Sequence, residues 1–420
     1  MDVYGKIMEN QDSKSHRELI LINISGADKS GITAELTAIL AKYDAQILDI
    51  GQADIHHTLS LGILFKTDSR RSGEILKELL FKTNDLNVQV QFNIISEEEY
   101  NRWVNGQGKN RYIITILGRK ISAGQISAVA SIITSQGLNI DTITRLTGRM
   151  PLDETTQPAT KGCIEFSVRG NIKDREKMQS DFMRLASSLN FDISMQEDTM
   201  YRRSRRLICF DMDSTLIKTE VIDELADRAG VGDEVRKITE SAMRGEIDFK
   251  ESFTRRVALL KGLDETVMKE IAENLPITEG VERMMEVLKR SGYKTAILSG
   301  GFTYFGNYLK QRFGFDYVYA NELEVGEDGK LTGRYVGDVV DGQRKRELLR
   351  LLAQVENINI AQTIAVGDGA NDLPMLAEAG LGIAFHAKPK VKAEAQQSIS
   401  TIGIDGVLYF LGFKDSYIGR

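Results

Sequence analysis

Residues 207–215 read Leu-Ile-Cys-Phe-Asp-Met-Asp-Ser-Thr, an apolar run that ends in two carboxylates. The apolar residues Leu207 to Phe210 predict a strand, and Asp211 and Asp213 stand where the chain leaves it. Two carboxylates at positions i and i+2 can face one site and bind Mg²⁺ through oxygen. Alone, such an acidic loop is more often a turn or a helix cap. The rest of the sequence therefore has to decide between these interpretations.

Beyond this stretch, predicted strands and helices alternate. Strands are predicted over 294–298, 363–366 and 381–385, and a helix over 344–354. The alternation predicts an α/β fold with a doubly wound parallel sheet, whose ligands bind beyond the carboxyl ends of the strands. Two of those ends carry short polar motifs, Leu298-Ser299-Gly300-Gly301 and Val366-Gly367-Asp368-Gly369-Ala370-Asn371-Asp372.

Together with Lys345 on the intervening helix, these motifs resemble the four-motif signature of the haloacid dehalogenase superfamily. Phosphoryl transfer from a monoester requires an in-line nucleophile and neutralisation of charge on the moving oxygens. The resemblance implies that Asp211 is the nucleophile, forming an aspartyl-phosphate, and that Asp213 is the general acid and base. It implies that Mg²⁺ is held by Asp211, the backbone carbonyl of Asp213 and Asp368, with Asp372 close by. The implied ligands of the phosphate oxygens are Ser299, the Gly300 N–H, Lys345 and Asn371.

Residues 219–278 lie between the first two motifs, and their apolar spacing predicts helices. In this superfamily the position holds a mobile cap. Within it, Ala242-Met243-Arg244-Gly245-Glu246-Ile247-Asp248-Phe249 and Ser252-Phe253-Thr254-Arg255-Arg256-Val257 resemble the cap of phosphoserine phosphatases, a family that residues 205–420 match throughout. The resemblance implies that Arg256 binds the substrate carboxylate, that Glu220 pairs with the ammonium group, and that Met243 and Phe249 line the short carbon chain. Without it, Met243 and Phe249 would be predicted as core residues and Arg256 as a solvent-facing side chain.

The amino-terminal half contains two α+β repeats of the order βαββαβ, over residues 17–98 and 110–197. The first has the loop Asp28-Lys29-Ser30-Gly31 before its first helix and resembles the ACT domain, a ligand-sensing module. Free N–H groups at a helix start suit an amino-acid carboxylate, so the candidate effector-binding residues are Asp28, Gly31, Asp49 and Gln52. The alternative is that the loop only turns the chain and the repeats dimerise. The second repeat lacks the loop pattern, which argues against ligand binding there.

Composition excludes several other classes of function. The chain has 420 residues, a net charge of −6 and two cysteines, Cys163 and Cys209. The acidic balance argues against general binding to nucleic acid or an anionic membrane, and no apolar run is long enough to span a bilayer. The amino terminus has no secretory pattern, so we expect a cytoplasmic protein. The basic stretch Arg202, Arg203, Arg205 and Arg206 is predicted to be a solvated linker that clamps two domains together, with an anion site as the alternative.

The resemblance to phosphoserine phosphatases implies an enzyme with Mg²⁺ as cofactor that hydrolyses O-phospho-L-serine to L-serine and phosphate, the last step of serine biosynthesis. We expect a homodimer, with L-serine as the candidate effector at the ACT-like repeats. A related alternative is a phosphatase or phosphotransferase for phosphohomoserine or phosphothreonine, because one extra methyl or methylene group is worth only about 1–3 kcal/mol of discrimination. Another alternative is an amino-acid-binding regulatory protein with an inert phosphatase fold.

Overall fold

The computed structural model describes residues 17–108, 110–149, 161–244 and 246–418. The side chains of Gln107 and Met243 also lie outside the described part. The sequence predicts an exposed loop over residues 150–161 of the second repeat, and this loop falls almost wholly outside the described residues. The chain divides into two compact units with a boundary after residue 109, and each unit is described below by itself.

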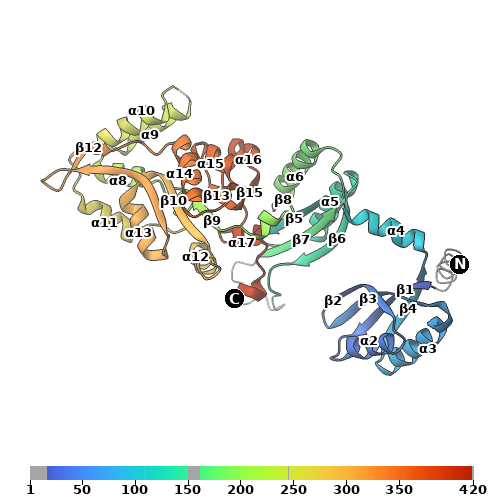
Figure 1. The fold of residues 1–420 in the computed structure, drawn as a ribbon. Helices are drawn as coiled ribbons and strands as arrows, with labels where there is room; N and C mark the ends of the chain where they lie inside the picture. Colours follow the sequence, from blue (N-terminus) through green and yellow to red (C-terminus); the bar gives the residue numbers. More distant parts are fainter. Residues whose placement is uncertain (1–16, 109, 150–160, 245, 419–420) are drawn as a thin grey trace, which may run out of the picture. The chain divides into compact units, whose positions relative to one another are not determined.

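The first unit contains the predicted βαββαβ repeat. Its antiparallel sheet has the order β2-β3-β1-β4, and its two helices cover one sheet face (Figure 1). Ile20, Ile22 and Ile24 alternate along β1 and are buried against the helices, which is the period-2 pattern that predicted the strand. The elements are β1 (Arg17–Ala27), α2 (Ile32–Lys42), β2 (Gln46–Ile55), β3 (Thr58–Asp68), α3 (Ser69–Asp85) and β4 (Val88–Ile95).

The segment after this repeat is helical, which its polar, glycine-containing sequence does not predict. Helix α4 (Glu97–Asn105) begins at Ser96, whose hydroxyl accepts a hydrogen bond from the Glu99 N–H at 3.1 Å. Three glutamates in the first turn suit the positive end of the helix dipole. The 3₁₀ turn η1 (Gly106–Gly108) follows.

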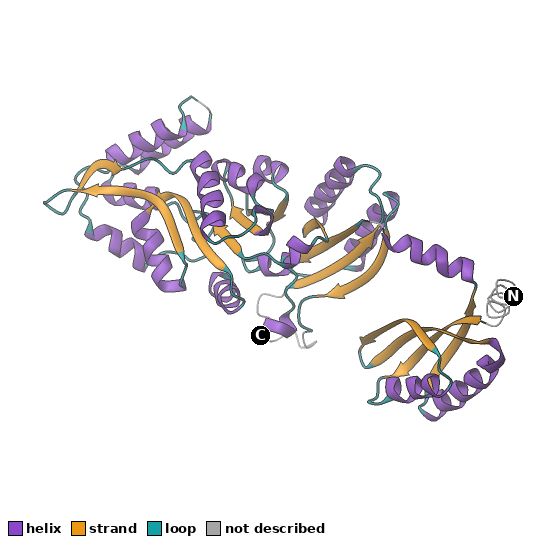
Figure 2. Cartoon of the chain, viewed as in Figure 1, coloured by secondary structure: helices purple, strands orange, loops and turns teal. Residues whose placement is uncertain are grey.

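The second unit begins with the second repeat. Its antiparallel sheet has the order β6-β7-β5-β8, and Figure 2 shows its two helices on one face. The elements are β5 (Arg111–Gly118), α5 (Ala123–Ser135), β6 (Asn139–Arg145), β7 (Gly162–Arg169), α6 (Arg175–Leu189) and β8 (Asp192–Glu197). Short helix α7 (Met200–Arg203) then leads into the phosphatase half.

The phosphatase half is built on a seven-stranded sheet of order β12-β11-β10-β9-β13-β14-β15, which confirms the predicted doubly wound α/β fold. All neighbouring strands are parallel except β11 and β12. Ile208 and Phe210 of β9 belong to the apolar cluster on one face, and Leu207 and Cys209 to the cluster on the other. Both faces are thus covered, which explains the unbroken apolar run. The strands are β9 (Leu207–Phe210), β10 (Lys294–Phe302), β11 (Tyr317–Val325), β12 (Leu331–Val336), β13 (Thr363–Gly367), β14 (Leu381–Phe385) and β15 (Gln397–Ile399).

Helices pack around this sheet and form the expected inserted cap. The helices that precede β10 in the cap are α8 (Val221–Ala229), α9 (Gly232–Met243), α10 (Phe249–Leu259) and α11 (Thr266–Glu273). The others are α12 (Val281–Arg290), α13 (Thr303–Phe313), α14 (Gly342–Val355), η3 (Ile360–Gln362), η4 (Ala370–Asp372), α15 (Leu373–Glu378), α16 (Pro389–Glu394), α17 (Gly406–Phe410) and α18 (Asp415–Ile418). Within the described residues, no helix is long and apolar enough to cross a bilayer.

The second repeat shares its interior with the phosphatase half. Leu117, Leu146 and Cys163 of the repeat are buried in one cluster with Tyr409 and Phe410 of α17. Ion pairs and hydrogen bonds surround this contact: Arg119 with Glu279 at 2.7 Å, Lys161 with Asp405, and the Gly148 N–H donating to Asp415 at 2.7 Å. The two parts therefore form one folding unit.

The basic stretch before β9 is not a solvated linker. Arg202 and Arg205 are only 8% and 5% exposed. Arg202 pairs with Glu165 of β7 at 2.8 Å, and the Arg205 Nη1 donates to the Gln196 side-chain oxygen at 2.8 Å. The prediction of a solvated stretch is therefore wrong for Arg202 and Arg205, which the shared interface buries, whereas Arg203 and Arg206 are exposed. The predicted clamp between two domains is confirmed by the pair of Arg202 with Glu165.

The shared interior predicts different outcomes for two truncations. Deleting residues 1–109 removes one compact unit, so the remaining chain should keep the thermal stability of the phosphatase. Deleting residues 1–204 also removes Leu117, Leu146 and Cys163 from the common core, a loss on the order of 5 kcal/mol at about 1.5–3 kcal/mol per buried side chain. Thermal unfolding followed by circular dichroism compares the two. Equal stability of both truncated chains would contradict the shared core.

Candidate active site

Three neighbouring strand ends meet at one edge of the parallel sheet. Phe210 at the end of β9 is in register with Ile297 of β10 and Val366 of β13. Since β9 lies between the other two strands, the residues that follow each strand converge at the point where the strand order reverses. The structure thereby brings together Asp211, Ser299 and Asp368, which are far apart in the sequence.

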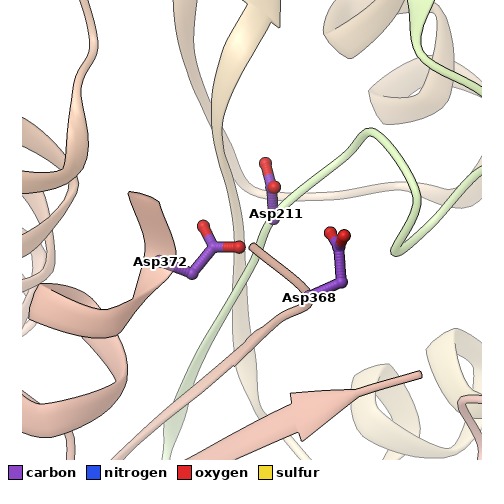
Figure 3. Close-up of side chains that lie close together, drawn as sticks. All are labelled: Asp211, Asp368 and Asp372. Atoms are coloured by element: carbon purple, nitrogen blue, oxygen red, sulfur yellow. The ribbon is translucent and has the colours of Figure 1, made fainter. Parts of the chain in front are cut away.

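Three carboxylates gather at this edge. Asp211, Asp368 and Asp372 each offer one oxygen, and these oxygens lie within 4.8 Å of one another (Figure 3). Burial, and then the charge of Asp372, raises the pKa of Asp211 well above its usual value. The same two causes, together with Glu220, raise the pKa of Asp368 to about 7. A cluster of hard oxygen donors that resist ionisation together suits a divalent cation such as Mg²⁺.

A buried lysine balances part of this charge. Lys345 in the first turns of α14 is 0% exposed, and its Nζ lies 2.8 Å from Asp211 and 2.6 Å from Asp372. Burial alone would lower the pKa of Lys345, but the two carboxylates hold it above its usual value. The second oxygen of Asp372 accepts from the Gly369 N–H at 3.0 Å. Both oxygens of Asp372 therefore already have donors.

The two oxygens of Asp211 differ in their partners. Oδ1 accepts from the Met212 N–H at 2.8 Å and faces Lys345 Nζ. Among the described residues, Oδ2 has no hydrogen-bond donor. One oxygen is thus held in place while the other keeps its lone pairs free, as a nucleophile requires.

Asp213 is suited to carry a proton. It is 8% exposed, and burial followed by the charges of Glu220 and Asp211 raises its pKa well above the usual range. A neutral carboxyl group in this position can donate its proton to a leaving group. A Cβ on Gly301 would lie 2.7 Å from Asp213 Oδ2, so a larger residue there would displace this group.

The phosphate-binding motif predicted at the end of β10 forms a tight loop. The Ser299 Oγ accepts from the Gly301 N–H at 2.9 Å. A Cβ on Gly300 would come within 3.2 Å of the Phe249 ring and 3.9 Å of the Asn371 amide nitrogen. The cap residue Phe249 and the motif residue Asn371 therefore both approach the Gly300 backbone.

Two polar residues that the sequence analysis missed support these motifs. The buried Asn321 of β11 donates to the Gly300 carbonyl at 2.8 Å and accepts from the Val340 N–H at 2.8 Å, which joins the loop to the segment before α14. The Thr215 hydroxyl donates to Asp368 Oδ1 at 3.2 Å. No sequence motif marks Asn321, whereas Thr215 belongs to the quoted stretch after β9.

The cap places a cation and an anion near the carboxylates. Arg256 of α10 is half-buried, its Nε donates to the Ser252 carbonyl at 3.4 Å, and it makes no ion pair among the described residues. Burial lowers its pKa, against the charges of Glu220, Asp223 and Asp213. Glu220 at the start of α8 accepts from the Ser214 hydroxyl at 2.8 Å. The side chain of Met243 lies outside the described part of the chain.

The β11–β12 hairpin is bound to the cap. The Gly262 N–H donates to the Leu331 carbonyl at 2.8 Å, and the Glu265 N–H donates to the Gly329 carbonyl at 2.9 Å. The Tyr335 ring meets Phe253 of α10 edge-on with centroids 5.3 Å apart. The hairpin thus holds the cap through backbone hydrogen bonds and an aromatic contact.

The candidate effector residues of the first repeat do not form one cluster. Asp28 and Gly31 lie in the exposed loop before α2, and Thr33 on that helix donates to the Gln52 side chain at 3.3 Å. Asp49 instead lines a groove of about 400 Å³ with Tyr100 and Trp103 of α4. The structure therefore brings Gln52, but not Asp49, toward the α2 start.

Comparison with protein families divides the chain as the repeats suggest. Residues 18–93 and 111–196 each match a model of the ACT domain, and residues 205–380 match the haloacid dehalogenase-like hydrolase model. The phosphoserine phosphatase of Streptomyces coelicolor is 39% identical over 94% of this chain and 92% of its own length. That of Mycobacterium tuberculosis is 36% identical over 94% of this chain and 93% of its own length.

Solved structures agree with this assignment. A probable phosphoserine phosphatase from Vibrio cholerae has a TM-score of 0.57 at 35% identity, covering 71% of this chain and 86% of that one. A haloacid dehalogenase family hydrolase from Salmonella enterica has a TM-score of 0.61 at 30% identity, covering 71% of this chain and 98% of that one.

The raised carboxyl pKa values predict an unusual dependence of stability on pH. With Asp368 titrating near pH 7, this carboxyl group binds more protons in the folded, metal-free protein than in the unfolded chain between about pH 4 and 7. The contribution of Asp368 to stability should therefore fall as the pH rises through this window, and Mg²⁺ should restore stability more at about pH 8 than at about pH 5.5. Thermal melts with and without Mg²⁺ test this. An Asp368→Asn variant should lose this contribution, and a metal-free wild type whose stability rises over this window relative to that variant would refute the argument.

Proposed function

This chain belongs to the phosphoserine phosphatase family, and from that premise we propose that it hydrolyses O-phospho-L-serine to L-serine and phosphate as the last step of serine biosynthesis. Two features of the site carry the proposal. Asp211 is buried and its Oδ2 has no hydrogen-bond donor within the described residues. Arg256 has no ion-pair partner within the described residues. One group suits attack on phosphorus and the other suits a substrate carboxylate. Four charged or polar motifs meeting at one edge also argue against an inert fold.

The first half of the reaction transfers the phosphoryl group to the protein. Asp211 Oδ2 forms a bond to phosphorus while the bond from phosphorus to the serine oxygen breaks. Asp213 gives its proton to that oxygen, so L-serine leaves as a neutral alcohol. The raised pKa of Asp213 supports this role, because burial and the charges of Glu220 and Asp211 favour the protonated form of the carboxyl group.

The second half returns the protein to its starting state. Asp213, now a carboxylate, takes a proton from water as the water oxygen attacks phosphorus and the bond to Asp211 Oδ2 breaks. Lys345 Nζ, Ser299, the Gly300 N–H and Asn371 are the groups proposed to bind the phosphoryl oxygens. Bound to Asp211, Asp368 and the Asp213 carbonyl, with Asp372 nearby, Mg²⁺ would neutralise charge on the transferring group.

The cap supplies recognition of the amino-acid end. A guanidinium binds a carboxylate in a bidentate manner, and Arg256 has its charge available for such a contact. Glu220 is proposed to meet the substrate ammonium group. Phe249, close to Gly300, and Met243 are proposed to enclose the short carbon chain.

The L-serine product is also the proposed effector of the first ACT domain, and a homodimer is the proposed assembly. The Asp28–Gly31 loop and Gln52 support a site at the start of α2, since Gln52 is already bonded to that helix. Asp49 lies apart from these residues in the groove beside α4. We therefore place the effector site at Asp28, Gly31 and Gln52.

Replacing the nucleophile should remove turnover but keep the fold. Asp211→Asn eliminates the attacking carboxylate, so kcat should fall by at least on the order of 10³-fold. Because burial opposes ionisation of Asp211, the neutral amide should leave the metal-free protein at least as stable as the wild type. Steady-state kinetics and thermal melts measure both. A variant that keeps more than a few per cent of kcat would exclude the covalent role.

Replacing the carboxylate partner should discriminate between substrates. Arg256→Ala leaves the substrate carboxylate unpaired, a loss of about 2–5 kcal/mol in kcat/KM for phosphoserine if that charge is desolvated. A phosphate ester without a carboxylate should lose little. The neighbouring Arg255, which is exposed and pairs with Glu251, provides the control variant Arg255→Ala. Equal losses on both substrates would assign Arg256 a structural role.

Deleting the first ACT domain should separate regulation from product inhibition. Allosteric coupling is typically about 1–3 kcal/mol and acts in both directions. The full chain should therefore bind more L-serine per protomer than a chain that starts at Asn110, and should be inhibited or activated differently. Equilibrium dialysis and initial rates measure both properties. If both chains have the same number of serine sites and the same inhibition, the repeats serve dimerisation instead.

A further inference from the structure

A large groove runs along the junction between the second repeat and the phosphatase half. Its volume is about 840 Å³, and its lining comes from α6 and β8 of the repeat and from β15 and α16 of the phosphatase half. All of these elements belong to the same compact unit. The groove is separate from the strand ends that carry the active site, since none of the catalytic motif residues line it.

Two buried arginines line this groove. Arg202 and Arg205 are 8% and 5% exposed, and among the described residues the Nε–H of each lacks a hydrogen-bond acceptor. Arg202 is neutralised by Glu165 at 2.8 Å. Arg205 has only a neutral partner, the side-chain oxygen of Gln196 at 2.8 Å. One buried guanidinium therefore lacks a counter-ion.

The other charges around the groove do not supply that counter-ion. Glu197 pairs with Arg175 at 2.6 Å. Asp192 accepts hydrogen bonds from the Ser400 N–H at 2.7 Å and from the Thr401 N–H and hydroxyl. Lys392 adds a further positive charge to the lining. Burial, and then the charge of Arg202, lowers the pKa of Arg205 to about 10, so the guanidinium remains charged at neutral pH.

The neighbouring arginines Arg203 and Arg206 are exposed, so burial in the interface is specific to Arg202 and Arg205. Arg203 is exposed and pairs with Asp198 at 3.0 Å. The Arg206 Nη1 donates to the Arg205 backbone carbonyl at 2.9 Å. Only Arg202 and Arg205 turn into the shared interface, where an unpaired charge is costly unless an anion joins it.

We propose that this groove is a binding site for a small oxyanion, either a phosphate or an amino-acid carboxylate, held by Arg205 with Arg202. Guanidinium groups bind both chemistries through paired N–H donors. The position gives such binding a structural consequence. Arg205 lies two residues before β9, which ends at Phe210, directly before Asp211, so an anion here fastens the second repeat to the strand that precedes the nucleophile.

Counting phosphate sites tests the proposal. Equilibrium dialysis of radiolabelled inorganic phosphate against the full chain gives the number of sites per protomer. Arg205→Met keeps the apolar stem and removes the charge, so this variant should have one site fewer than the wild type. Arg203→Met is the matched control, because it removes an exposed arginine from the same segment and should keep the wild-type number. Equal site numbers in all three proteins would overturn the proposal.

Two further measurements complete the test. If Arg205→Met does not fold, Arg205→Lys keeps the charge but loses the paired donors, and phosphate should bind this site at least tenfold more weakly; unchanged binding would overturn the proposal. Competition identifies the source of the anion. If L-serine displaces phosphate from the Arg205-dependent site, the natural ligand class is an amino-acid carboxylate, and if it does not, the class is phosphate.

Discussion

The buried ammonium of Lys345 is the interaction on which the site depends. Three carboxylates with oxygens within 4.8 Å of one another would repel strongly in a buried setting. Lys345 contacts two of them directly, at 2.8 and 2.6 Å, and none of its surface reaches solvent. Burial raises the pKa of Asp211 and that of Asp368, and one positive charge cannot neutralise all three carboxylates, so both pKa values stay raised. A divalent cation would neutralise the residual negative charge, which explains why the protein's own groups leave the site incompletely compensated.

The two repeats differ in whether they share a compact unit with the phosphatase half. The second repeat buries Leu117 and Cys163 in the phosphatase core, whereas the first forms its own compact unit. The phosphatase half already covers part of the sheet of the second repeat. Less of that sheet is therefore free to bind an effector. The proposed L-serine effector site therefore lies in the first repeat, while the second repeat is packed into the core of the phosphatase half.

Much of this could be predicted from the sequence because the decisive residues lie next to strands with clear patterns. The motifs at Asp211, Ser299 and Asp368 follow apolar runs, so parallel pairing alone brings them together. The burial of Arg205 could not be predicted, because its partner Gln196 is itself buried and donates to the carbonyl of Phe410, 214 positions further along the chain. Asp49 was grouped with Asp28, but a bulge between Ile47 and Asp49 shifts the register of β2, and a shift of one residue moves a side chain to the other sheet face. Helix α4 was missed although Ser96 and Glu99 form a helix start, because the glycines at 106 and 108 weighed more.

The β11–β12 hairpin connects the Gly300 loop with the cap. Asn321 of β11 ties the Gly300 loop to the same hairpin whose far end is hydrogen-bonded to the cap at Leu331. The proposed phosphate ligands and the proposed carboxylate ligand Arg256 are thus connected through one pair of strands. A substrate longer by one methylene group would have to stretch this connection or lose one of its two charged contacts. Discrimination by a hydrophobic pocket alone is worth only about 1–3 kcal/mol per methylene, whereas an unpaired desolvated charge costs more. We therefore propose that the contacts of the hairpin with the Gly300 loop and the cap, rather than the walls of the pocket, would separate phosphoserine from its longer homologue.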